Sequence, residues 1–251
     1  MKTLERTVLS DIAEEVARAL SFATVEGGSA YVSTAVSYPN GSAVVVRIDA
    51  DESGYVVTDD GQGAFIAETM GAGATFAGIA RTEAARLGVS LSERSIFAAN
   101  VSREALPGAV AVIANVSTRA VDRTAAALET MRRKRSQERF RSGLRSAFGE
   151  RVAFDLDGVR GTWRSWDFDA GLYEGKRIAA LFTFVSPAFS AVASASLKLR
   201  DVRSADDHPR LVVALADYGG TEASLRALLN EEADRVVPAD SDPDQFRQVA
   251  A

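Results

Sequence analysis

The chain has 251 residues, 47% of them hydrophobic and 25% charged, and its net charge is −5. This composition is typical of a globular protein with one large core or two ordinary ones. Because the chain has no cysteine, disulfides, zinc–thiolate sites, iron–sulfur clusters and cysteine nucleophiles are excluded. The single histidine, His208, lies in an Asp-Asp-His-Pro sequence that is typical of an exposed turn. A hard-metal site made of carboxylates is left open, but we expect no cofactor and no resident metal.

The N-terminal segment predicts a helix. Its apolar residues recur every four positions, which indicates an amphipathic helix with one buried stripe formed by Leu4, Val8, Ile12, Val16 and Leu20. The first residues lack the apolar core of a signal peptide, and no stretch approaches the roughly 18 apolar residues of a membrane span. We therefore expect a cytoplasmic protein that does not contact a membrane.

Strand patterns follow over residues 30–37, 42–49 and 54–58, and the short turns between them predict an antiparallel meander. Two short helices are expected near 64–70 and 75–87, with a further strand over 94–101. Pro107 then opens a long helix, since proline suits a first helical turn.

This long helix carries a seam in alternating steps of three and four residues. The seam predicts packing against another element of the chain or against a partner subunit, so a homodimer through the 107–131 helix is one hypothesis. Its positions are Val110, Ile113, Ser117, Ala120, Thr124, Leu128 and Met131.

The strongest shift in composition lies between residues 132 and 145, where basic side chains dominate. They include Arg132, Arg133, Arg135 and Arg139. One interpretation is a phosphate-contacting face for nucleic acid, because arginine matches phosphate oxygens. The other interpretation, which the sequence favours, is a solvated connecting helix whose positive charges balance the acidic surface around it. We place a domain boundary here, with an N-terminal α+β domain over 1–131 and a C-terminal α/β domain over 132–251.

In the second domain, strands are predicted over 151–155, 162–169, 177–185, 211–216 and 235–238, and helices after Ser186 and Gly220. Asp157-Gly158 is expected to be the first turn. The tail from Asp240 is expected to be loosely packed. The fold class is therefore α+β: an antiparallel meander with helices, a long connecting helix, and a C-terminal domain with a mixed sheet.

The order helix, three strands, helix, strand over residues 136–217 resembles the core of the restriction-endonuclease-like superfamily. That resemblance implies a metal-binding acid on the second strand, where Asp167 and Asp169 are candidates, and a Glu-x-Lys on the third. The third strand has neither acid nor lysine, and Glu174-Gly175-Lys176 falls in the expected hairpin turn. We therefore predict a nuclease-like outline without activity.

In the first domain, Tyr55-Val56-Val57-Thr58-Asp59-Asp60-Gly61 resembles the signature of a bacterial and prophage domain-of-unknown-function family, over residues 4–128. The resemblance implies a setting in phage–host conflict. Asp59 and Asp60 are candidates for binding a metal or a basic group, or alternatively form a turn and helix cap.

Trp163 and Trp166 are placed on a strand with their side chains on opposite faces. One of them is a candidate for an exposed contact, but the sequence favours packing in the core for both.

Three functions remain open. The sequence favours a non-enzymatic, two-domain binding protein that acts through a protein partner. The first alternative is a nucleic-acid-binding protein or divalent-metal-dependent nuclease that uses residues 132–145 and the weak catalytic candidates Asp167, Asp169, Glu174 and Lys176. The second is a homodimeric scaffold.

Overall fold

The computed structural model describes residues 2–205 and 207–250, with side chains from residue 8 onward. The chain has the predicted α+β fold and divides into two compact units between Glu129 and Thr130, where the sequence placed the division after residue 131. We call them the N-terminal unit and the C-terminal unit, and each is described by itself.

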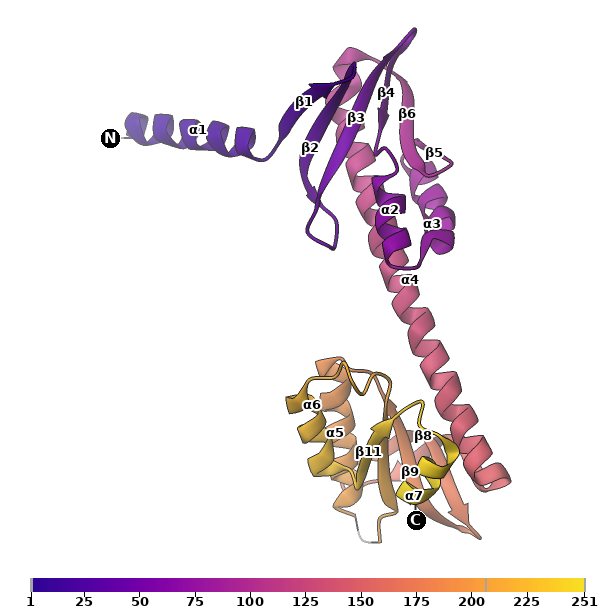
Figure 1. Cartoon of the computed structure of the whole chain (residues 1–251). Coiled ribbons are helices and arrows are strands. Elements are labelled where there is room, and N and C mark those ends of the chain that lie inside the picture. The colour runs from indigo at the N-terminus through magenta and orange to yellow at the C-terminus, as the bar shows by residue number, and fades with distance from the viewer. Residues whose placement is uncertain (1, 206, 251) are drawn as a thin grey trace. The chain divides into compact units, whose positions relative to one another are not determined.

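The N-terminal unit is built on a six-stranded sheet in which all neighbouring strands are antiparallel. The order across the sheet is β1-β2-β3-β4-β6-β5 (Figure 1). The strands are β1 (Phe22–Glu26), β2 (Ser29–Ser37), β3 (Ala43–Asp51), β4 (Gly54–Thr58), β5 (Ser90–Ser92) and β6 (Ser95–Val101). The predicted meander is confirmed. The sequence missed β1 and β5, because both are short and largely exposed, without a buried face to produce a pattern.

Helices α2 (Gln62–Thr69) and α3 (Gly73–Arg86) pack against this sheet together with the start of α4 (Leu106–Phe148), which follows a 3-10 turn at Arg103–Ala105. The core joins side chains from the strands, from α3 and from α4, among them Val46, Val57, Ile96, Phe76 and Ile113. The predicted helices are thus confirmed within a few residues.

Helix α4 is a single helix of 43 residues that begins beside Pro107, as predicted. Part of its seam is filled by the chain itself, because Ile113, Ser117, Ala120 and Thr124 are buried in the N-terminal core, whereas Met131 is 40% exposed. A homodimer through the 107–131 helix stays a prediction, for which the buried part of the seam is not accessible.

Helix α1 (Lys2–Ala19) forms where it was predicted, but the predicted burial of its apolar stripe is wrong. Val8, Ile12, Val16 and Leu20 are 50–55% exposed, and the side chain of Leu4 lies outside the described residues. The periodicity reports that a helix is amphipathic, and it says nothing of what covers the apolar face.

The C-terminal unit contains a five-stranded sheet with the order β11-β10-β9-β8-β7. Its strands are β7 (Val152–Arg160), β8 (Ser165–Glu174), β9 (Arg177–Val185), β10 (Arg210–Leu215) and β11 (Arg235–Pro238), and a 3-10 turn at Gly149–Arg151 precedes them. β7, β8 and β9 pair antiparallel, whereas β9, β10 and β11 pair parallel, so the predicted mixed sheet is confirmed.

The first hairpin of this sheet differs from the prediction. Asp157-Gly158 lies inside β7 at a bulge, where the register shifts between Leu156 and Val159, and the turn comes later at 161–164. A glycine with positive φ suits a β-bulge as well as a turn. The Asp157-Gly158 sequence therefore indicated a turn where the strand has a bulge.

Two helical layers cover this sheet. The end of α4 and α7 (Pro243–Ala250) pack on one face, while α5 (Phe189–Arg203) and α6 (Ala223–Glu232) pack on the other. Successive residues of β9 serve the two faces, so Leu181 and Phe182 are both fully buried. The predicted loose tail is wrong, because α7 buries Phe246 among the aromatic rings of Phe140 and Phe182. No helix in the described part of the chain combines the length and apolarity that crossing a bilayer requires.

Candidate functional site

A polar pocket of about 350 Å³ lies in the C-terminal unit where β8, β9 and α5 meet. Two acidic side chains, Asp167 and Asp169, face three basic ones across it. The remaining walls are mostly hydroxyl-bearing or small side chains. The charged and polar lining residues are Arg133, Arg164, Ser165, Trp166, Asp167, Asp169, Thr183, Ser186, Ser194 and Lys198.

Asp169 is held in place by β9. Its Oδ2 accepts hydrogen bonds from the Phe184 amide at 2.7 Å and from Thr183 Oγ1 at 3.3 Å. Because a strand neighbour supplies both donors, this carboxylate is positioned by rigid backbone, as a functional group requires.

Lys198 comes into the pocket from α5. Its Nζ donates to Thr183 Oγ1 at 2.7 Å and to the Asp167 carbonyl at 3.0 Å. Desolvation lowers the pKa of Lys198, and the charges of Asp169 and Asp167 counteract this shift. A lysine, a hydroxyl and a carboxylate are thereby linked in one hydrogen-bonded series.

The structure separates the other two catalytic candidates from this pocket. Glu174 is the last residue of β8 and lies opposite Arg177 in the strand register with β9, and Lys176 lies in the turn between these two strands. Five residues of strand put Glu174 roughly 16 Å from Asp169. The four weak candidates therefore do not form one site, and the lysine of the pocket is Lys198, which the sequence analysis missed.

The donor set of the pocket fits a hard divalent cation only in part. Among the described residues there is no group of three or more acidic, histidine or cysteine side chains able to hold a metal ion. Mg²⁺ is nevertheless bound in many sites by one or two carboxylates, with water and substrate phosphate completing the coordination. Asp167 and Asp169 would be the protein ligands in such a site.

Arg133 connects the pocket with the basic stretch at the end of α4. Within the described part of the chain, the cations at 132, 133, 134, 135 and 139 form no ion pair, whereas Arg141 pairs with Asp155. The charges at 132–135 are exposed, in agreement with a solvated helix, and none of them contacts an acidic side chain within 4 Å in the described part of the chain.

The two tryptophans have different environments. Trp163 lies in the turn before β8 and is 69% exposed, so the prediction that both rings sit on one strand is wrong. Trp166 lies on β8, donates from Nε1 to Asp201 at 2.6 Å and stacks under the Arg164 guanidinium at 4.3 Å. The half-buried ring of Trp166 forms part of the pocket wall, and Trp163 is exposed, while a role in binding stays a prediction for it.

The Asp59–Asp60 corner in the N-terminal unit serves the fold. Asp59 is fully buried and accepts hydrogen bonds from the Ile96 amide at 2.8 Å and from Ser117 Oγ at 2.6 Å, with longer bonds from Gly61 and Gly63. Desolvation raises the pKa of Asp59, and these hydrogen bonds oppose that shift.

Two neighbours complete the corner. A side chain at Gly63 would place its Cβ 2.5 Å from Ser117 Oγ, so only glycine fits there. Asp60 is paired with Arg47 at 2.5 Å. The alternative in which these carboxylates make a turn and hold a helix start accounts for the observed contacts of Asp59.

His208 lies in a loop and is half-buried, and its Nδ1 lies 3.1 Å from the carbonyl oxygen of Pro209.

Comparison with known proteins found no matching family model, no matching curated protein and no matching solved structure.

Proposed function

We propose that this chain is a nucleic-acid-binding protein whose C-terminal unit grips the phosphate backbone with the basic end of α4 and the adjoining polar pocket. The observation that carries the proposal is that Arg133 lines the same pocket as Arg164 and Lys198. Three cations from α4, the turn before β8 and α5 thus converge on one polar cavity. Guanidinium groups match phosphate oxygens in geometry and charge.

Further exposed cations lie on the same helix. Arg132, Arg135 and Arg139 share one face of α4, next to that of Arg133, and have no acidic partners among the described residues. A local patch of this kind supports backbone binding even though the chain carries a net charge of −5. The exposed ring of Trp163 adds a surface on which a base can stack, as in proteins that bind single strands.

Binding to fluorescent single- and double-stranded DNA at a series of salt concentrations tests the proposal. We expect the affinity to fall as salt rises, and Arg133→Gln to reduce the slope of log K against log [salt] by about 0.9 on duplex DNA, the loss of one phosphate contact. Arg177→Gln is the matched control, because Arg177 is also exposed but lies at the far end of β9. Absence of binding at low salt, or an equal effect of both substitutions, would refute the proposal.

Divalent-metal-dependent cleavage is a second candidate, favoured by one specific observation: Asp167, Asp169 and Lys198 share the pocket. A bound cation would neutralise phosphate charge and make its water ligand more acidic. For the chain's own residues, we assign Asp169 to cation binding and Lys198 to stabilising phosphate charge.

End-labelled DNA incubated with Mg²⁺ or Mn²⁺ distinguishes binding from cleavage. If the site cleaves, Asp169→Asn abolishes product while DNA binding persists, and Glu174→Gln, on the same strand but outside the pocket, leaves the rate unchanged. If neither metal supports cleavage by the unmodified chain, the site binds without cutting.

The function favoured by the sequence, binding of a protein partner, stays a prediction, as does the phage–host setting implied by the signature. Its structural support lies in the N-terminal unit, in the exposed apolar face of α1.

A further inference from the structure

Helix α1 presents an apolar face that no part of the described chain covers. All side chains from residue 8 to residue 20 are exposed. They include large apolar ones that follow the helical repeat: Val8 at 52%, Leu9 at 65%, Ile12 at 50%, Val16 at 51% and Leu20 at 55%. The opposite face bears Glu14 and Arg18, which pair with each other. A helix of this kind gains stability when its apolar face is buried.

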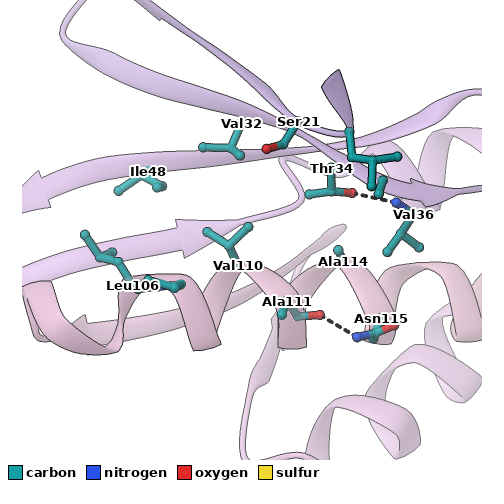
Figure 2. A pocket seen from close by; sticks show the side chains of 13 residues that line it. Ser21, Val32, Thr34, Val36, Ile48, Leu106, Val110, Ala111, Ala114 and Asn115 are labelled. Carbon is teal, nitrogen blue, oxygen red and sulfur yellow. Dashed lines mark hydrogen bonds between the residues drawn. The ribbon is translucent and has the colours of Figure 1, made fainter. Parts of the chain in front are cut away.

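The same unit contains an open apolar groove of about 500 Å³ between the sheet and the start of α4. Figure 2 shows side chains of Val32 and Ile48 from the strands and of Leu106 and Val110 from the helix around one space. The lining of the groove includes Leu20 and Ser21, the two residues between α1 and β1. An apolar helix face and an apolar groove thus adjoin at a single connector.

We propose that the groove of each chain receives helix α1 of a second copy, so that two copies form a dimer by exchanging their N-terminal helices. This inference concerns the N-terminal unit and is independent of nucleic-acid binding by the C-terminal unit.

The connector favours exchange over docking of a chain's own helix. Only Leu20 and Ser21 separate α1 from β1, and Phe22 is already paired with Ser33 of β2. So short a connector, which also forms a wall of the groove, leaves little chain with which α1 could reverse into it. Short hinge segments favour the exchange of an element between identical copies, and a two-fold exchange closes without leaving a free groove.

Because the chain has no cysteine, engineered cysteines can locate the helix directly. The test uses the full chain carrying Ile12→Cys and Ala111→Cys, since Ala111 lines the groove but is exposed and tolerates change. With a flexible bismaleimide we expect a covalent dimer on a denaturing gel. The matched control replaces Ile12→Cys by Glu14→Cys on the opposite face of α1, which we expect to cross-link several-fold less.

A cross-link confined to single chains would overturn the exchange and assign the groove to a chain's own α1. Equal cross-linking by the Ile12 and Glu14 variants, or none by either, would also overturn it.

Light scattering at micromolar concentrations provides the second measurement. We expect the unmodified chain to have the mass of a dimer, and both the α1 variant Ile12→Glu/Val16→Glu and the groove variant Ala111→Glu to have that of a monomer. A mixture of the two variants should again contain dimers, since one intact helix can enter one intact groove. A monomeric unmodified chain, or a mixture that stays monomeric, would contradict the proposal, and circular dichroism confirms that each variant is folded.

Discussion

Replacing Asp59 with alanine should destabilise the N-terminal unit strongly and leave the C-terminal unit unchanged. The substitution removes the acceptor of four hydrogen bonds, of which those from the Ile96 amide at 2.8 Å and from Ser117 Oγ at 2.6 Å are short. At about 1.5–3 kcal/mol for each bond to a charged acceptor, these two contribute roughly 3–6 kcal/mol. The cost of desolvating Asp59 offsets part of this, so the expected loss is about 2–4 kcal/mol.

Two probes separate the units in one urea titration. Both tryptophans, Trp163 and Trp166, lie in the C-terminal unit, so their fluorescence follows that unit alone, while far-ultraviolet circular dichroism follows both. The Asp59→Ala variant should show an earlier transition by circular dichroism and an unchanged one by fluorescence.

Asp60→Asn is the control, because asparagine tolerates the φ of 51° at this position and the lost ion pair with Arg47 is worth less than about 1 kcal/mol. Two outcomes would contradict this prediction. One is a loss of unfolding free energy for Asp59→Ala no larger than that for Asp60→Asn. The other is a shift of the fluorescence transition together with the circular-dichroism transition.

Three further predictions concern buried carboxylates. Because desolvation raises the folded-state pKa of Asp59, the proton-linked part of its contribution to stability is present below about pH 4 and is lost as pH rises through that pKa, while the hydrogen bonds to the ionised carboxylate remain; Asp59→Asn should flatten this decline in the circular-dichroism midpoint. Glu83 is buried between Arg86, Arg119 and Arg123, so Glu83→Gln should cost about 1–3 kcal/mol in urea unfolding, and an unchanged midpoint would contradict this. Desolvation opposes ionisation of Asp201, but hydrogen bonds from the Trp166 indole and the 163 and 164 amides prevail and lower its pKa. The stability that Asp201 confers on the C-terminal unit should therefore be present above about pH 4 and be lost as pH falls through its lowered pKa, and Asp201→Ala should remove this part of the acid-induced loss and shift tryptophan emission to the red.

The elements with a one-sided or fully buried pattern were predictable from the sequence. β9 is the clearest case, since its residues 180–183 are buried on both faces of the sheet and leave a nearly continuous apolar run. The start of α5 after Ser186-Pro187 and the meander around Pro39-Asn40-Gly41 follow from local backbone chemistry, which acts over a few residues and so can be recognised in one sequence.

The candidate site was only half predictable. Asp167 and Asp169 were found because they lie on an expected strand, whereas no sequence pattern singled out Lys198. Its role depends on α5 packing across β8 and β9, a tertiary arrangement that leaves no local signal. The same is true of Arg133, whose contribution to the pocket depends on the docking of α4 against the sheet.

The segment Tyr55–Gly61 contains Asp59, which joins three distant pieces of chain: the start of α2, the strand β6 and, through Ser117, the first third of α4. This heptapeptide closes the sheet of the N-terminal unit onto its helices. Whatever that unit recognises would therefore have to be sought on its outer surface.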